Sequence, residues 1–255
     1  MHLNFNAEVG TNYKSMSQKV RVMSEQWVEQ EIFCPNCGNE INKYLNNKPV
    51  KDFYCSVCSE DFELKSKKDK LASKLVDGAY ETMMNNLNSQ RQANFFILVY
   101  LMESFKISNF CVIPKHFFIP EIVEKRKPLA NTARRKGWIG CNLLLKYIPE
   151  SGKVYYIKNS VVEAKDKVIE KWEKTLFLRE KQLNKSKGWL IDIMKCIDKL
   201  GKKSFTLNEV YSFENELRSL HSNNKHIKDK IRQQLQVLRD KDYLQFTSRG
   251  NYCLK

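Results

Sequence analysis

The sequence has few of the features that mark disordered, fibrous, membrane-spanning or secreted chains. Its 255 residues include only nine glycines and six prolines, which excludes a collagen-like or low-complexity composition. It has no apolar run of about 18 residues, the length that a membrane-spanning helix needs. The N-terminal stretch MHLNFNAEVGTNYKS has neither the basic start nor the apolar core of a secretory signal. We therefore expect a cytoplasmic protein.

Acidic residues are scarce relative to basic ones. The chain has 44 Lys and Arg against 29 Asp and Glu, which gives a formal net charge of +15. This excess favours a polyanionic partner, most simply nucleic acid; the alternative is a basic surface that is merely solvated. Hydrophobic residues make up 42% of the chain, enough to bury the core of one large or two modest domains.

Apolar patterning predicts a mixed α/β or α+β domain over residues 1–180. Helical spacing of apolar residues predicts helices, and continuous or alternating apolar runs predict strands. We expect helices over 14–32, 70–88 and 161–178, and strands over 94–102, 109–114 and 153–158.

Residues 181–255 have the element order of a winged helix-turn-helix domain. The charged stretch 179–188 has no apolar period and is interpreted as a linker. The pattern beyond it predicts helices over 188–200, 205–221 and 226–246, the last passing into a short strand. A strand–turn–strand with its turn at Arg249-Gly250-Asn251 then ends the chain.

Four of the eight cysteines form two CxxC pairs separated by 17 residues. These are Cys34 with Cys37 and Cys55 with Cys58, and the spacing is typical of a ribbon-type tetrathiolate site. Four soft thiolates favour zinc in a closed tetrahedron, so we expect a structural zinc knuckle over 34–58. The alternative is a redox disulfide pair, although redox motifs usually contain a single CxxC.

Two carboxylates and a lysine flank the second CxxC pair. If 50–55 and 61–66 are strands, Glu63 and Lys65 share one face, and Asp52 on the neighbouring strand can share it too. Two carboxylates can hold Mg²⁺, and a lysine beside them places a fixed positive charge near a reacting phosphate. The alternative is a solvated strand face, on which Glu-x-Lys is common.

Two basic segments are candidate DNA contacts. In the stretch KRKPLANTARRKGWIG (125–140), Arg134 and Arg135 can contact phosphates, while Trp138 either stacks on bases or packs under the loop. The third C-terminal helix should enter the major groove, where Asn and Gln pair with adenine and Arg with guanine. Candidate contacts on this helix and the wing are Asn223, Asn224, Lys225, His226, Lys228, Arg232, Gln233 and Arg249, with His226 also interpretable as a helix cap.

The segments CPNCGN, DFYC, FELKSKK, RKPLANTARRKGWIGCN and HIKDKIRQQLQVLRD occur in this order along nearly the whole chain. In them the sequence resembles the DpnI-like methyl-directed type II restriction endonucleases of the PD-(D/E)xK superfamily. The resemblance departs at one point, since Lys51 rather than proline precedes Asp52.

The resemblance implies a PD-(D/E)xK catalytic domain fused to a winged helix. It implies Mg²⁺-dependent cleavage of double-stranded DNA at GATC sites that carry N6-methyladenine. It also implies that Asp52, Glu63 and Lys65 are catalytic, that Asp52 and Glu63 bind magnesium, and that Cys34, Cys37, Cys55 and Cys58 bind zinc. We expect a monomer that acts on DNA without a membrane partner.

Two other functions remain open at this stage. The first is a non-catalytic methyl-DNA reader or transcriptional regulator, with Asp52 and Glu63 as surface charges. The second is a nuclease directed at structured RNA.

Overall fold

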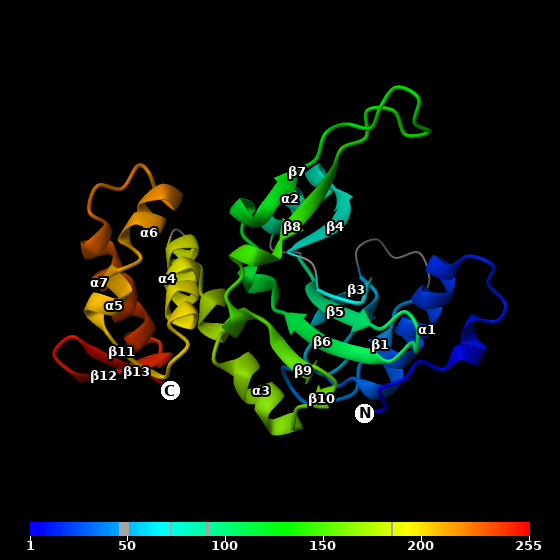
Figure 1. The fold of residues 1–255 in the computed structure, drawn as a ribbon, viewed down its shortest axis with the longest axis horizontal. Coiled ribbons are helices and arrows are strands. Elements are labelled where there is room, and N and C mark those ends of the chain that lie inside the picture. Colours follow the sequence, from blue (N-terminus) through cyan, green and yellow to red (C-terminus); the bar gives the residue numbers. More distant parts are fainter. Residues whose placement is uncertain (46–50, 72, 90–91, 185) are drawn as a thin grey trace.

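A seven-stranded mixed sheet forms the centre of the molecule in the computed structural model, which describes residues 1–45, 51–71, 73–89, 92–184 and 186–255 (Figure 1). In spatial order its strands are β1 (Asn42–Lys43), β2 (Phe53–Tyr54), β3 (Asp61–Lys68), β5 (Asn94–Tyr100), β6 (Ile107–Ile113), β9 (Val154–Lys158) and β10 (Val161–Val162). β3 and β5 are parallel, and the other neighbouring pairs are antiparallel.

The central strand β5 is buried along its whole length because both faces of the sheet are covered. Phe96 and Leu98 point into a core that α1 (Met16–Glu31) and α3 (Lys165–Glu173) complete with Trp27 and Trp172. Residues of the opposite parity, such as Phe95, point into a second core. The period of two along the strand thus assigns each side chain to one of two cores.

A smaller antiparallel sheet and one helix line the second core. The sheet has the order β4 (Lys74–Ala79), β8 (Gly140–Leu144) and β7 (Val123–Lys125), and the helix is α2 (Tyr80–Asn88). Short 3-10 helices connect these elements: η1 (Ala7–Gly10), η2 (Lys115–Phe117), η3 (Pro120–Ile122), η4 (Leu145–Tyr147), η5 (Glu150–Gly152), η6 (Leu176–Arg179) and η7 (Lys181–Leu183).

The prediction of one helix over 70–88 is wrong in its first half. Residues 74–79 form the strand β4, which pairs with β8, and the helix begins only at Tyr80. The apolar spacing of Leu75, Ala79 and Met83 fits a helix, but pairing with a strand about 65 residues away decides the structure. Residue 72, inside the predicted helix, lies outside the described residues.

The predicted helix 161–178 is also shorter in the structure than in the sequence pattern. Only Lys165–Glu173 are α-helical, preceded by β10 and followed by η6. The predicted strands at 94–102, 109–114 and 153–158 are confirmed as β5, β6 and β9, with their ends moved by up to two residues.

The C-terminal part is a winged helix-turn-helix, as predicted. Its elements are α4 (Lys187–Leu200), β11 (Ser204–Thr206), α5 (Leu207–Tyr211), α6 (Glu214–Leu220), α7 (Ile227–Asp240), β12 (Leu244–Ser248) and β13 (Asn251–Leu254). The predicted helix 205–221 is split between α5 and α6. A capping box starts α5, because the Thr206 side chain accepts from the Glu209 N–H and the Glu209 carboxylate accepts from the Thr206 N–H.

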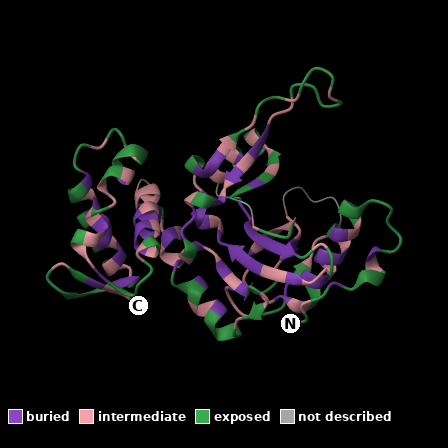
Figure 2. Ribbon diagram, viewed as in Figure 1, coloured by how far each residue is buried: buried purple, intermediate pink, exposed green. Residues whose placement is uncertain are grey.

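The charged stretch 179–188 is packed rather than extended. Leu178 and Leu183 are buried in the second core, which continues into Leu190 and Ile191 of α4. Across this junction, Asp198 of α4 accepts hydrogen bonds from the N–H and hydroxyl of Ser151, at 2.9 and 3.0 Å. Buried segments therefore run through the central strands and into α4 (Figure 2). Residue 185 lies outside the described part, and the division at 180/181 stays a prediction.

None of the helices in the described part of the chain is long and apolar enough to cross a membrane.

Candidate active site and nucleic-acid interface

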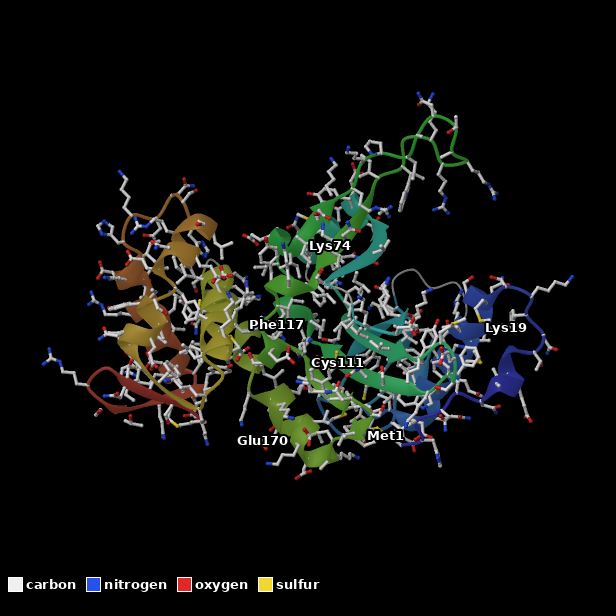
Figure 3. The ribbon with its side chains drawn as sticks, in the orientation of Figure 1. Met1, Lys19, Lys74, Cys111, Phe117 and Glu170 are labelled. Atoms are coloured by element: carbon white, nitrogen blue, oxygen red, sulfur yellow. The ribbon has the colours of Figure 1, made fainter. Side chains whose placement is uncertain are left out.

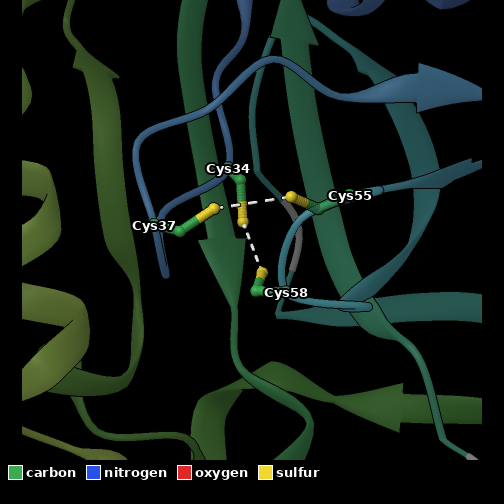
Figure 4. Close-up of side chains that lie close together, drawn as sticks. All are labelled: Cys34, Cys37, Cys55 and Cys58. Carbon is green, nitrogen blue, oxygen red and sulfur yellow. Dashed lines mark hydrogen bonds between the residues drawn. The ribbon is translucent and has the colours of Figure 1, made fainter.

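The four CxxC cysteines converge at one end of the β2–β3 hairpin (Figure 4). Their sulfur atoms all lie within 4.8 Å of one another, and the pairs Cys34–Cys58 and Cys37–Cys55 are each 3.4 Å apart. Zinc at about 2.3 Å from each sulfur requires sulfur–sulfur edges of about 3.8 Å. The cluster can therefore hold one tetrahedral ion with small adjustments, as the spacing predicts.

Local backbone turns hold the two CxxC pairs in place. In the first turn the Gly38 N–H donates to the Cys34 carbonyl at 2.8 Å, and Gly38 has a φ of +72°, which favours glycine. In the second, the Cys55 N–H donates to the Glu60 carbonyl at 2.9 Å. The second turn joins β2 to β3, so the cysteine cluster fixes the register of the hairpin. Residues 46–50 of the predicted knuckle, including the first residue of the predicted strand 50–55, lie outside the described part.

Glu63 and Lys65 share the face of β3 that points toward β4, as alternation predicts. The Lys65 Nζ lies 2.5 Å from Glu63 Oε1 and 2.6 Å from Asp77 Oδ1. All three side chains are largely buried, with exposed fractions of 21%, 13% and 9% for Lys65, Glu63 and Asp77. Sequence analysis missed Asp77 because it lies in the stretch that was interpreted as helix.

Asp52 lies beside this group, at the edge of β3. Its N–H donates to the Phe62 carbonyl at 2.9 Å, which puts Asp52 opposite Glu63 in the antiparallel register. Its carboxylate turns to the strand edge and accepts the Leu64 N–H at 2.7 Å. Asp52 thus lies just before β2, where the pairing of β2 with β3 ends.

A cavity of about 360 Å³ lies between α1 and this strand edge, and Asp52 is part of its wall. Glu25 of α1 also lines it, 5% exposed and paired with Arg21 at 2.6 Å and Lys43 at 2.7 Å. Two carboxylates from different elements therefore flank one cavity. Glu25 is a second acidic residue that sequence analysis did not single out.

Burial raises the pKa values of the two carboxyl groups, Glu63 and Asp52. Burial, together with the charges of Asp77 and Asp52, raises the pKa of Glu63 to about 7 although Lys65 opposes this. Burial also raises the pKa of Asp52, against the Leu64 N–H bond. Burial alone would lower the pKa of Lys65, but Glu63 and Asp77 raise it, so Lys65 keeps its charge.

One carboxylate oxygen in this cluster lacks a hydrogen-bond partner in the part of the chain that the structure describes. Glu63 Oε2 is buried and has no hydrogen-bond partner among the described residues. A buried carboxylate oxygen without a donor is costly unless a cation or proton satisfies it. Outside the four cysteines, no set of three metal-ligating side chains in the described residues brings its ligand atoms within 4.8 Å. In this cluster the Lys65 ammonium contacts both Glu63 and Asp77.

The basic segment between β7 and β8 forms a long loop that stands out from the body of the molecule (Figures 1 and 3). Arg134, Arg135 and Lys136 at its end are exposed, and none of them forms an ion pair within 4 Å of a described acidic residue. Hydrogen bonds across its base, such as the Leu129 N–H to the Trp138 carbonyl at 2.9 Å, stiffen it. The loop therefore presents free cationic groups on a defined support.

Trp138 is half-buried at the base of this loop. Its ring lies over Gly140, where an added Cβ would be 2.8 Å from the indole. This contact agrees with the interpretation that Trp138 packs under the loop, and it leaves part of the ring accessible for stacking.

The expected recognition surface of the winged helix lies at the start of α7 and on the wing. Asn223, Lys225, His226, Lys228, Arg232, Gln233 and Arg249 are exposed, and Asn224 is half-buried. Asn224 Oδ1 accepts the His226 N–H at 2.8 Å, whereas the His226 side chain makes no capping bond to α7. Arg232 pairs with Asp229. His226 thus occupies the cap position, and its exposed imidazole faces Asp229, with Nδ1 3.9 Å from the Asp229 Oδ2.

These features together define a DNA-acting protein with a mixed α/β core, a four-cysteine cluster, an acid–lysine cluster and a winged helix-turn-helix. Comparison with known families identifies it further. The DpnI family model, described as the Dam-replacing family, matches residues 1–181, and the DpnI_C model, described as the Dam-replacing HTH domain, matches residues 185–253. The chain belongs to the DpnI family and is a methylation-dependent restriction endonuclease.

Proposed function

We propose that this protein is a type II restriction endonuclease that cuts double-stranded DNA at GATC sites carrying N6-methyladenine, by Mg²⁺-dependent phosphodiester hydrolysis. The observation that supports it most is the buried Glu63 Oε2, which has no partner among the described residues and belongs to the carboxylate that Lys65 contacts. The Asp52 carboxylate lies near enough for its charge to help raise the pKa of Glu63. A site that keeps such an oxygen is suited to an added cation.

The donor set fits a hard divalent ion. Asp52 and Glu63 would hold Mg²⁺ through carboxylate oxygens, the ligands that this ion prefers. When bound, the ion would polarise the scissile phosphate and lower the pKa of the attacking water.

The other residues of the cluster orient groups and supply charge. Lys65 keeps its positive charge beside Glu63, where it would stabilise negative charge that develops on the phosphate. Asp77 holds the Lys65 ammonium at 2.6 Å and acts as a positioning residue. The hydrogen bond from the Leu64 N–H fixes the Asp52 carboxylate at the strand edge.

Two surfaces would read the DNA. The loop residues Arg134 and Arg135 would contact phosphates, and Trp138 would contact bases. The start of α7 and the wing would enter a groove through Asn223, Asn224, Lys225, His226, Lys228, Arg232, Gln233 and Arg249. One buried methyl group contributes only about 0.8 kcal/mol, about a fourfold preference. If two surfaces each test one methyl group, their preferences multiply, which favours reading of the methylated palindrome by both surfaces. We propose that the protein acts as a cytoplasmic monomer.

The alternative of a non-catalytic methyl-DNA reader has one observation in its favour, although membership of the DpnI family indicates a nuclease. Lys65 is already paired with two carboxylates, so the cluster could be a structural ion-pair network in which no metal binds. The partner-free Glu63 Oε2 favours the nuclease over this reader.

Plasmid digestion tests the proposal. GATC-containing plasmid, methylated or unmethylated at adenine, is incubated with the full chain with and without Mg²⁺. We expect cutting of the methylated plasmid only, and only with Mg²⁺. Tight binding of methylated DNA without cutting would support the reader, and cutting of structured RNA at a similar rate would support an RNA-directed nuclease.

A further inference from the structure

A pocket of about 500 Å³ lies at the junction of the two matched segments, away from the acid–lysine cluster. The end of α2, the η2–η3 segment and the start of α4 surround it. His116 lines the pocket. Its neighbour Phe117, labelled in Figure 3, shows where the pocket lies in the molecule. The volume is in the range of small-molecule sites.

The wall of this pocket is cationic. Lys115, Arg179 and Lys187 line it, and no Asp or Glu does among the described residues. Glu60, which is not part of the lining, pairs with both Lys115 at 3.3 Å and Arg179 at 2.5 Å, so one carboxylate faces three cations. Lys187 has no acidic partner within 4 Å in the described structure, and burial lowers its pKa. An anionic ligand would relieve this excess of positive charge.

Two polar groups in this wall have unused hydrogen-bonding capacity. Gln92 is 5% exposed, and both its Nε2 and its Oε1 are buried without a partner in the described part of the chain. Arg179 Nη2 is likewise buried without a partner. Such groups are normally satisfied in native proteins, so a missing ligand is a physical explanation.

The Arg179 guanidinium is held firmly enough to act as a binding group. Its Nη1 donates to Glu60 Oε1 at 2.5 Å, and its Nε donates to His116 Nδ1 at 3.2 Å. Burial, with Arg179 and nearby lysines, lowers the pKa of His116 well below its usual value, so the ring is neutral and can accept. The guanidinium also lies over the Trp172 ring, 5.3 Å from its centroid. The remaining nitrogen, Nη2, has no partner within the described ranges.

We propose that this pocket binds an adenine nucleotide unit, with the phosphate facing Lys115, Arg179 and Lys187 and the base facing Gln92. A Gln amide offers one donor and one acceptor side by side, which match the N6 and N7 of adenine. Phe118, Ile119 and Pro120 supply the apolar wall for the base.

The nucleotide has two possible sources, a free nucleotide or a unit of the DNA strand. Both present the same phosphate and base, so the pocket chemistry is common to them. The inference goes beyond the proposed cleavage, since binding of a free nucleotide requires no nuclease activity.

Titration calorimetry of the full chain with adenosine 5′-monophosphate tests it, with inorganic phosphate as the second probe. We expect the monophosphate to bind more tightly than phosphate, and Gln92→Leu and Lys187→Met each to weaken its binding at least about tenfold, the loss expected for one hydrogen bond to a charged or buried group. Gln30→Leu, an exposed change on α1, should bind as the wild type does. Equal binding of phosphate and nucleotide, or wild-type affinity in Gln92→Leu, would overturn the proposal.

Melting temperature gives an independent check of the site. Because the buried Gln92 amide has no partner among the described residues, Gln92→Leu should raise the melting temperature of the ligand-free protein. A lower melting temperature would show that the amide has a structural partner, and would also overturn the proposal.

Binding to a methylated GATC duplex, without divalent ions, identifies the source. If DNA supplies the nucleotide, the monophosphate competes with the duplex and Gln92→Leu weakens duplex binding. If the nucleotide is free, duplex affinity is the same in both proteins, and only binding of the monophosphate changes.

Discussion

At the scale of single residues, the buried carboxyl of Glu63 is the feature with the clearest physical consequences. Its pKa of about 7 means that the folded protein holds a proton more tightly than the unfolded chain, in which Glu titrates near 4.5. The contribution of Glu63 to the free energy of unfolding is therefore greatest below about pH 4.5. It decreases as the pH rises from there toward 7.

Glu63→Gln removes this pH dependence. A shift of this size corresponds to about 3 kcal/mol, so the variant should be more stable than the wild type above pH 7 and nearly equal to it near pH 4.5. Urea unfolding at several pH values measures the difference. Glu29→Gln, an exposed change on α1, should follow the wild type throughout; a Glu63→Gln curve parallel to the wild-type curve would contradict the account.

Asp77→Asn tests the positioning of Lys65. With one of its two carboxylate partners neutralised, the ammonium should shift, and we expect single-turnover cleavage to slow about 10–100-fold. Affinity for the methylated duplex should stay unchanged, because Asp77 lies outside the expected DNA-contact surfaces. Cleavage at the wild-type rate would show that Asp77 does not position the lysine.

The candidate site was partly predictable from sequence for a specific reason. Alternation along a strand is a local rule, so Glu63 and Lys65 could be placed on one face from their spacing alone. Asp77 and Glu25 reach the site through pairing and packing of elements distant in the chain, and no local pattern encodes that. Asp77 also lies in β4, in a stretch that the sequence pattern predicts as a helix, so its position beside Lys65 could not be predicted.

At the scale of elements, the β2–β3 hairpin depends on the cysteine cluster. A tetrathiolate zinc site contributes about 10–16 kcal/mol, which is as large as the whole stability of a typical domain, about 5–15 kcal/mol. The hairpin carries Asp52 and Glu63, so the metal at its end would determine the geometry of the candidate active site.

Cys34→Ser should release the metal and loosen the hairpin. Elemental analysis should find about one zinc per wild-type chain and markedly less in the variant, and hydrogen exchange should show lost protection over residues 53–68. Cys253→Ser, outside the cluster, should keep its zinc. Wild-type protein without bound metal, or an unchanged exchange pattern in Cys34→Ser, would contradict the zinc assignment.

The loop between β7 and β8 should act through phosphate contacts. Arg134→Ala and Arg135→Ala should each weaken binding to methylated and unmethylated DNA alike, and reduce the slope of log K against log salt by about one. Lys167→Ala on α3, whose side chain pairs with Glu170, serves as the control. Loss of methyl preference with an unchanged salt slope would indicate base contacts instead.

Elements were predictable where local signals were strong. The run FFILVY after Asn94 is apolar without a break, which predicts a buried strand, and the structure has β5 there. The stretch 70–88 was ambiguous because its apolar spacing suits a helix, while the partner strand β8 lies far along the chain. Tertiary pairing overrode local spacing there.

At the scale of the whole molecule, the two matched segments share a core. Leu183 and Leu190 are buried together, and Asp198 of α4 accepts two hydrogen bonds from Ser151. The predicted linker therefore packs the winged helix against the α/β part, which charge patterning could not reveal. The net charge of +15 did predict the nucleic-acid partner, since that inference needs no coordinates.

The most direct test of the account is single-turnover cleavage and equilibrium binding of a methylated GATC duplex by Asp52→Asn, with Mg²⁺ present in the cleavage assay. Asp61→Asn, on β3 two residues before Glu63 and paired with Lys51, is the matched control. We expect Asp52→Asn to bind the duplex as the wild type does and to lose cleavage by several orders of magnitude, while Asp61→Asn keeps it. Wild-type cleavage by Asp52→Asn would contradict the assignment of the active site.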